Sequence, residues 1–378
     1  MPTTSDTYCP LKWDELVINT THNYVYACCK ATPMVFVKDI KEILQPQQEN
    51  LLNGVKDPSC KYCWDVEEVG GKSRRIEAIA KAKVIGRRTS LEVNFGNECN
   101  FQCSYCNPRF SSKWEQDVRK APYQIFVDRD NYSLPETVTG QVSNEELLTS
   151  SEEYDIVRIV GGEPLLSKRF WALVGEAKSK KLSVVTNLSF SNSTVIGKIV
   201  DLCKKYEEVQ LGVSIDAGKE ISEFVRHGLN FDQFMQNLNQ IFEVAPANLS
   251  ISVQSLMTNF TVTDIQQFRG IVSKWKEQFP RLRWILSYCV SPRMQSFETL
   301  PLQNREELIG VFDELASLGY VQGAESIKSS LILSKFNSTI HKQMRHFFLE
   351  FATRKNVTIP ACLTCLAEPD TELTYTKR

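Results

Sequence analysis

Long apolar runs are missing from the sequence. No run approaches the roughly 18 apolar residues that a membrane-spanning helix needs, and the N-terminal stretch MPTTSDTYCPLKWDE lacks the basic and then apolar segments of a secretory signal. An excess of charge of either sign is missing too. The 44 basic and 45 acidic residues give a formal net charge of -1, so no overall field favours nucleic acid or an anionic membrane. We therefore expect a cytoplasmic protein with no membrane partner and no nucleic-acid partner.

Histidine is scarce, whereas cysteine is abundant. The four histidines show no metal-ligand spacing, and we expect them to be structural or on the surface; they are His22, His227, His341 and His346. Twelve cysteines are many for a reducing compartment, where disulfides are uncommon. Cys203 and Cys289 lie in apolar patterns and are predicted to pack in the core. The others form an N-terminal group, a central triplet and a C-terminal pair: Cys9, Cys28, Cys29, Cys60 and Cys63; Cys99, Cys103 and Cys106; Cys362 and Cys365.

Short strand patterns alternate with helix patterns through the middle of the chain. Six β-branched runs have the composition and length of strands: residues 90–95, 156–162, 181–188, 209–216, 249–258 and 282–290. Helix-length stretches separate them, at residues 167–180, 193–206, 231–244 and 264–279. Strands joined by helices imply right-handed crossovers and a parallel sheet, either doubly wound or an open partial barrel. In both architectures functional groups gather at the C-terminal ends of the strands.

The central triplet, in CNFQCSYC at residues 99–106, directly follows the first of these strands. Its spacing, C-x3-C-x2-C with no nearby fourth Cys or His, fits a structural zinc site poorly because such sites use four ligands. Closely spaced cysteines in a loop suit an iron–sulfur cluster. Three cysteines on four irons leave one iron open, and at the mouth of a parallel barrel an open iron is a binding site for another group.

The triplet and the motifs after it resemble the radical S-adenosylmethionine (SAM) superfamily. GGEP (161–164) follows the second strand, TNLS (186–189) ends the third, SID (214–216) ends the fourth, and FVRHG (224–228) comes next. The resemblance covers about residues 90–292. It implies an α/β fold with a partial (β/α)6 TIM barrel, a [4Fe-4S] cluster on Cys99, Cys103 and Cys106, and SAM bound to the open iron.

The resemblance also implies which residues contact SAM. Gly161, Gly162 and Glu163 would let backbone groups approach the methionine amino group, and Tyr105 would face the adenine. Polar residues at strand ends match positions near the SAM ribose and carboxylate, and an arginine suits that carboxylate; these residues are Thr186, Asn187, Ser214, Asp216 and Arg226. Taken singly, each motif could be an ordinary turn, loop or helix cap. Their order along successive strands favours a SAM site.

The N-terminal cysteines allow two interpretations. Residues 13–30 predict a hairpin followed by paired cysteines, and residues 58–64 supply a C-x2-C. On spacing alone this is typical of a small zinc module. The arrangement also resembles the SPASM and twitch extensions of radical SAM enzymes, which carry auxiliary iron–sulfur clusters but usually follow the barrel. We favour one closed auxiliary [4Fe-4S] cluster on Cys9, Cys28 or Cys29, Cys60 and Cys63, with Cys362 and Cys365 as either further ligands or inert thiols.

These patterns divide the chain into three parts. We expect an auxiliary-cluster domain at residues 1–85, a radical SAM partial barrel at 86–300 and a C-terminal helical segment at 301–378. Helix patterns at 305–320 and 338–355 are expected to cover the barrel and to return the C-terminal cysteines to the N-terminal domain. The charged segment 107–150, between the first two strands, is expected to form a lid or wall on the catalytic face.

The expected activity is that of a radical SAM oxidoreductase or transferase. Reductive cleavage of SAM would give a 5'-deoxyadenosyl radical that abstracts hydrogen from an unactivated C–H of an amino-acid residue, a peptide, or a small amino acid or sugar. A flavodoxin or ferredoxin would supply electrons, and the auxiliary cluster would aid redox chemistry or bind substrate. Two alternatives stay open: an RNA-modifying radical SAM enzyme, which needs a positive face at the barrel mouth, and a zinc-ribbon binding protein on an inactive barrel.

Overall fold

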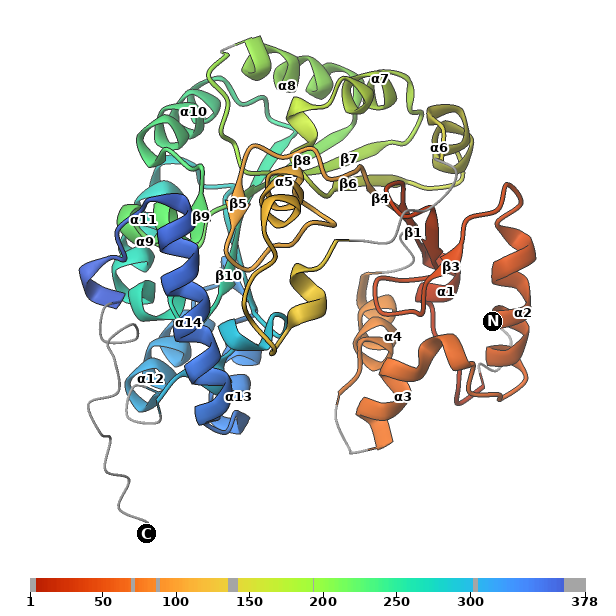
Figure 1. Ribbon diagram of the computed structural model, residues 1–378. Coiled ribbons are helices and arrows are strands. Elements are labelled where there is room, and N and C mark those ends of the chain that lie inside the picture. Colours follow the sequence, from red (N-terminus) through yellow and green to blue (C-terminus); the bar gives the residue numbers. More distant parts are fainter. Residues whose placement is uncertain are drawn as a thin grey trace.

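A ten-stranded mixed sheet runs through the molecule (Figure 1). The computed structural model describes residues 5–68, 72–85, 89–134, 142–192, 194–301 and 305–363. Within these residues the strand order is β12-β11-β10-β8-β7-β6-β4-β1-β2-β3. The strands are β1 (Glu15–Asn19), β2 (Tyr24–Tyr26), β3 (Met34–Val35), β4 (Ser90–Asn94), β6 (Ile156–Val160), β7 (Lys181–Thr186), β8 (Glu208–Ser214), β10 (Leu249–Met257), β11 (Arg283–Tyr288) and β12 (Val321–Gln322).

All six strands predicted from the sequence are present and pair in parallel with their neighbours, from β4 through β6, β7, β8 and β10 to β11. The connecting helices cover the outer side of the curved sheet (Figure 1). They are α6 (Asn144–Ser151), α7 (Lys168–Glu176), α8 (Thr194–Lys205), α9 (Lys219–Val225), α10 (Phe231–Val244) and α11 (Ile265–Gln278). The predicted α/β architecture with a parallel sheet is confirmed.

The core lies between the sheet and these helices. In β7, for example, Leu182 and Val184 are buried against the helices, while Lys181 and Ser183 point to the other face. Phe170 of α7 and Phe234 of α10 are fully buried in the same core, and burial of one such side chain contributes roughly 1.5–3 kcal/mol. The inner face of the sheet is left polar, which makes it available for binding.

The N-terminal hairpin is part of the same sheet. β1 pairs antiparallel with β2, as the sequence predicts, and also pairs in parallel with β4, with Leu16 opposite Leu91. The helices α2 (Lys41–Leu52), α3 (Lys61–Glu68) and α4 (Arg74–Ile85) lie together on one side of the molecule, with the short α1 (Leu11–Asp14) (Figure 1). The expected boundary at residue 85 falls at the end of α4, and the sheet continues across it.

The predicted C-terminal helices are present as α12 (Arg305–Ala316) and α14 (Ser338–Lys355), with α13 (Ala324–Leu333) between them. α14 packs through Phe347 and Phe351 on α5 (Ser112–Lys120). Leu363 belongs to this same cluster, on the opposite side of the molecule from α1–α4 (Figure 1). Up to Leu363 the C-terminal segment packs with α14 and α5, and the expected return of the C-terminal cysteines to the N-terminal domain stays a prediction. Cys365 and the side chain of Cys362 lie outside the described residues.

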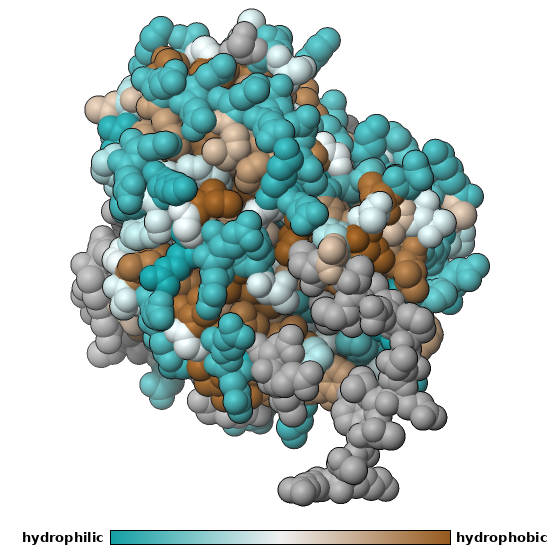
Figure 2. All heavy atoms as spheres, turned by 90° about the vertical axis from the view of Figure 1, so that its left-hand side faces the viewer, coloured by the Kyte–Doolittle hydropathy of each residue, from teal (hydrophilic) through white to brown (hydrophobic). Residues whose placement is uncertain are grey.

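The surface over α14 is mixed in character. Figure 2 shows this side of the molecule, with hydrophilic residues over most of it and apolar residues exposed between them. None of the described helices combines the length and the apolar character that crossing a bilayer requires.

Candidate active site

The loop after β4 carries the three central cysteines at the C-terminal end of the first barrel strand, as predicted. Cys99, Cys103 and Cys106 are partly buried free thiols. The two-residue strand β5 (Gln102–Cys103) pairs antiparallel with β9 (Arg226–His227), so Cys103 lies opposite Arg226. This pairing joins the cysteine loop to the segment after α9. The loop is thus fixed at the edge of the sheet where functional groups of parallel barrels gather.

Burial dominates the chemistry of these thiols. It raises the pKa of Cys99 to about 12, with a further contribution from Cys103, and the pKa of Cys103 to about 11 despite the nearby Arg226. It also raises the pKa of Cys106. The thiols are therefore neutral by themselves at pH 7. Thiolates form here only when a cation such as iron takes the place of the protons, which is the chemistry that an iron–sulfur ligand set requires.

An aromatic wall supports the loop from outside. Trp114 of α5 is fully buried, and its ring contacts Tyr123, Tyr132 and Phe347. The hydroxyl of Tyr132 donates to the carbonyl oxygen of Ser104, 2.7 Å away. Because these rings exclude water from the back of the loop, the described part of segment 107–150 acts as a wall for the cysteine loop.

The glycine turn after β6 packs directly against the segment that leads into Cys99. Gly161 and Gly162 have positive φ angles of 86° and 50°. A Cβ on Gly162 would lie 2.5 Å from the carbonyl oxygen of Glu98, and a Cβ on Gly161 would lie 2.0 Å from Oδ1 of Asn94. The glycines are therefore required by the protein itself, since no side chain fits and L-residues disfavour these angles.

Glu163, the next residue, joins the ends of β6 and β7. Its carboxylate accepts hydrogen bonds from the Thr186 hydroxyl (2.7 Å), the Asn187 amide (2.6 Å) and the Leu165 amide (3.1 Å). Burial raises the pKa of Glu163 to about 7, although these donors oppose the shift. The Asn187 side chain in turn donates to Oδ1 of Asn100, between Cys99 and Cys103, at 2.8 Å. The structure thus brings the GGE and TN motifs together with the cysteine loop.

A buried ion pair connects the end of β8 with β9. Arg226 donates to both oxygens of Asp216, at 2.7 and 3.2 Å, and the Tyr105 hydroxyl donates to Oδ2 of the same carboxylate. Asp216 has no exposed surface. Burial and Asp216 raise the pKa of Tyr105 well above its usual value, against the effect of Arg226. The expected SAM residues Asp216, Arg226 and Tyr105 are therefore together, and here they bind one another. Ser214, the remaining expected contact, is the last residue of β8.

Several residues of this site were not identified from the sequence. Gln295 donates to the carbonyl of Ser104 at 2.7 Å and accepts from its hydroxyl at 2.9 Å, although it lies far away in the sequence. Asn100 is placed inside the cysteine motif, and Trp114 follows it closely. Their closeness to the triplet was a usable signal for these two, whereas nothing near Gln295 in the sequence indicates its role.

The N-terminal cysteines divide into four that share a cavity and one that does not. Cys9, Cys28, Cys60 and Cys63 are buried and line one small cavity, whereas Cys29 is exposed. Burial is the main cause of the raised pKa of Cys9, about 12, and of Cys28. Among the described residues, no group of three or more His, Cys, Asp or Glu side chains is arranged to hold a metal ion. The grouping of the four thiols therefore rests on the shared cavity.

Cys203 and Cys289 are buried, in agreement with their predicted place in the core. His22 is buried, whereas His346 is exposed and His227 and His341 are partly buried. This fits their expected structural or surface character.

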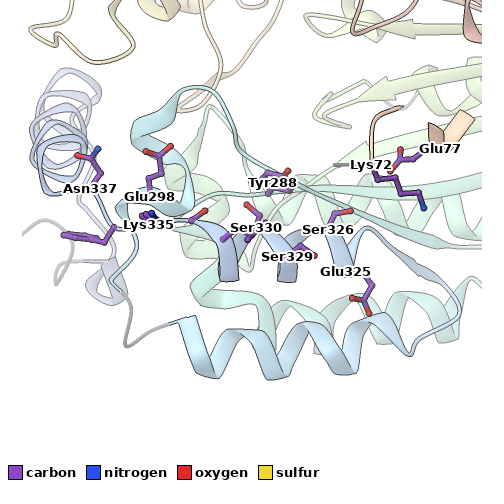
Figure 3. Close-up of a pocket in the computed structure, with 13 residues that line it drawn as sticks. Lys72, Glu77, Tyr288, Glu298, Glu325, Ser326, Ser329, Ser330, Lys335 and Asn337 are labelled. Atoms are coloured by element: carbon purple, nitrogen blue, oxygen red, sulfur yellow. The ribbon is translucent and has the colours of Figure 1, made fainter. Parts of the chain in front are cut away.

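A polar cavity of about 760 Å³ opens beside the sheet (Figure 3). Ser326, Ser329 and Ser330 of α13 line it together with Tyr288, the last residue of β11. Glu77 of α4 lies across from them (Figure 3). Because Tyr288 ends a parallel strand, the cavity reaches the edge of the sheet that also carries the cysteine loop.

Two solved structures match the chain at low identity. SuiB from Streptococcus suis, bound to its precursor peptide SuiA, matches with a TM-score of 0.38 and 11% identity over 91% of this chain and 70% of that one. The radical SAM methyltransferase TsrM from Kitasatospora setae matches with a TM-score of 0.33 and 13% identity over 53% of this chain and 34% of that one.

Curated relatives and a family model match the barrel region. GTP 3',8-cyclase from Synechocystis sp. is 30% identical over 159 residues, which cover 40% of this chain and 42% of the cyclase. The cyclase from Mannheimia succiniciproducens is 26% identical over 225 residues, 58% of each chain. The chain thus spans about half the length of these cyclases. Residues 93–269, which contain the cysteine triplet and the motifs around it, match the family model described as the Radical SAM superfamily.

Proposed function

We propose that the protein is an enzyme that cleaves SAM reductively and uses the resulting 5'-deoxyadenosyl radical to abstract a hydrogen atom from a substrate C–H. One observation carries this proposal. Three partly buried cysteines at the end of β4 lie against the Gly161–Gly162 turn and the polar ends of β7 and β8, in a segment that matches the Radical SAM family. The donor set consists of thiols only, which suits a [4Fe-4S] cluster.

The residues of the site would hold and shield the cofactors. When bound, the reduced cluster supplies the electron that cleaves SAM to methionine and the radical. Cys99, Cys103 and Cys106 would hold three irons. Trp114 and Tyr132 exclude water behind the loop, and the Glu163 and Asp216 networks fix the strand ends that would contact SAM. Arg226 is held in place by Asp216, which its Nε and Nη2 bind.

We further propose that Cys9, Cys28, Cys60 and Cys63 bind one closed auxiliary [4Fe-4S] cluster of the SPASM or twitch kind. Their shared cavity supports this set, and the exposure of Cys29 argues for Cys28 as the ligand from the paired cysteines. A cluster with four thiolate ligands has no open iron, so its role would be electron transfer. An acidic one-electron carrier such as a flavodoxin or ferredoxin would supply the electrons.

For the substrate we propose an amino-acid residue, a peptide, or a small amino acid or sugar. The polar cavity between α13 and α4 supports a substrate that forms many hydrogen bonds, because serine hydroxyls and carboxylates line it. Its volume of about 760 Å³ falls in the range of small-molecule sites, about 300–1,000 Å³.

A nucleotide is a second candidate substrate, and the names of the curated relatives support it. The curated relatives are named for a reaction of GTP.

Iron and sulfide content after anaerobic reconstitution tests the proposed function. We expect about eight irons per chain, two four-iron clusters, and SAM cleavage under dithionite. The variant Cys99→Ala/Cys103→Ala/Cys106→Ala should keep one cluster and lose cleavage. If both proteins retained zinc and only the wild type contained iron, the N-terminal cysteines would form a structural zinc site and no auxiliary cluster. Equal SAM cleavage by the two proteins would overturn the proposal.

Calorimetry with GTP separates the two substrate classes. GTP binding by the wild type that is kept in Lys204→Gln, an exposed surface control, would favour the nucleotide. Absence of GTP binding to the wild type would leave the amino-acid, peptide and sugar substrates.

A further inference from the structure

Two buried cations flank the four-cysteine cavity. Lys12 and Arg75 line it together with the cysteines and are 1% and 7% exposed. Lys12 interacts electrostatically with Cys28 and Cys60, and Arg75 with Cys9 and Cys63. Each cation therefore acts on a different pair of the four thiols.

The charge of Arg75 is already balanced by the protein. Its guanidinium forms an ion pair with Glu67 at 2.6 Å and donates to the carbonyl oxygens of Asp6 and Tyr8 at 3.0 Å. These bonds hold the segment before Cys9 against α4. Arg75 is thus explained as a structural residue that positions one of the cysteines.

The charge of Lys12 is not balanced in this way. Its ammonium donates to the side-chain oxygens of Gln47 and Ser59, both neutral, and no Asp or Glu in the described part of the chain lies within ion-pair distance of it. The buried carboxylate of Asp57 is near and attracts Lys12, and the Ser59 hydroxyl bridges the two, so Asp57 balances the lysine charge in part. Burying an ammonium without a direct ion pair is costly. Lys12 also lines the cavity of the four cysteines and acts on two of them, so thiolates in that cavity would complete its charge balance.

We propose that Lys12 is a positioning residue for the auxiliary cluster: its ammonium balances the negative charge of the four thiolates and raises the reduction potential of that cluster. This inference rests on the proposed auxiliary cluster and adds a residue that sets its redox behaviour. Four thiolates give a [4Fe-4S] centre net negative charge, and reduction by one electron increases it. A buried cation therefore stabilises the reduced form more than the oxidised form, because Coulomb interactions are strong where water is excluded.

The variant Lys12→Met tests this inference, since methionine keeps much of the length of the side chain and removes its charge. It is made in the Cys99→Ala/Cys103→Ala/Cys106→Ala background, where the auxiliary cluster is the sole remaining one. We expect a lower midpoint potential in an EPR-monitored redox titration and faster iron release to a chelator.

Two further variants complete the test. Lys61→Met, on the exposed face of α3, should leave potential and iron release unchanged. Lys12→Arg keeps the charge and should keep the potential close to that of the parent protein. Two results would overturn the inference in protein that still binds iron. Either the midpoint potential falls equally in Lys12→Met and Lys12→Arg, or it falls in neither variant. If the triple-alanine parent contained no iron, the proposal of an auxiliary cluster would itself be wrong.

Discussion

The indole N–H of Trp114 donates a hydrogen bond to the main-chain carbonyl of Cys103, 2.8 Å away. This bond joins the middle cysteine of the triplet to α5, and α5 is held in turn by α14. The C-terminal helix therefore stabilises the cysteine loop through one aromatic residue, although the two segments are far apart in the sequence.

Trp114→Phe is expected to weaken the cysteine loop without unfolding the protein. The change leaves the buried Cys103 carbonyl without its donor, which costs about 1–3 kcal/mol, and it leaves a small gap. Bleaching of the cluster absorbance by a chelator should become faster. Trp171→Phe is a suitable comparison, since the indole of Trp171 donates to the Leu165 carbonyl, away from the cysteines. Equal bleaching rates for both variants would contradict a specific role of Trp114.

Gly162→Ala should abolish assembly of the triplet site. The new Cβ would meet the Glu98 carbonyl oxygen at 2.5 Å, at a φ of 50°, so the segment that enters Cys99 must move. Iron per chain should fall to the content of the triple-alanine variant. Gly175→Ala is the matched control, because a Cβ there meets nothing within 4 Å and the helix gains about 0.5–1 kcal/mol. Full iron content in Gly162→Ala would refute the steric argument.

The Asp216–Arg226 pair should show strong coupling in unfolding experiments. Arg226→Met leaves the fully buried Asp216 charge without its partner, which typically costs about 3–5 kcal/mol. The double variant Asp216→Asn/Arg226→Met removes both charges and should be less destabilised than the sum of the single variants. Urea unfolding of the four proteins gives the coupling energy. Additive effects would show that the two side chains act independently.

Glu163 should make the stability of the apo-protein fall as the pH rises. Its pKa is raised by burial from the ordinary value of 4.5 to about 7, so folding favours the neutral form. This contribution is complete below pH 4.5 and is lost as the pH rises through 7, by on the order of 3 kcal/mol. Relative to Glu163→Gln, the wild type should therefore lose stability between acidic and alkaline pH. Parallel profiles of unfolding free energy against pH for the two proteins would contradict the shift.

The barrel strands and long helices could be predicted because their patterns are local. α10 and α14 begin and end where the sequence pattern places them, and each buried strand shows its β-branched run. The two-residue pairing of Cys103 with Arg226 could not be predicted, since so short a ladder exists because tertiary structure brings the segments together. The same holds for Gln295 with Ser104.

The N-terminal part shows the same limit. Its hairpin was predicted from residues 13–30, but the pairing of β1 with β4 was not, because the pattern of a strand does not specify its neighbour. Cysteine spacing could not decide between Cys28 and Cys29. That distinction came from burial, which depends on how α1, α3 and the hairpin pack. The sequence does not single out Lys12, which is buried in the structure.

The parallel pairing of β1 with β4 also determines what happens when the barrel is separated from its N-terminal part. Without β1, the strand that leads into the cysteine loop becomes an open sheet edge with unpaired N–H and C=O groups. Such an edge pairs readily with other chains and promotes aggregation. The N-terminal segment therefore shields the edge of β4 in addition to contributing cysteines. A truncated barrel that begins near residue 89 is expected to be insoluble.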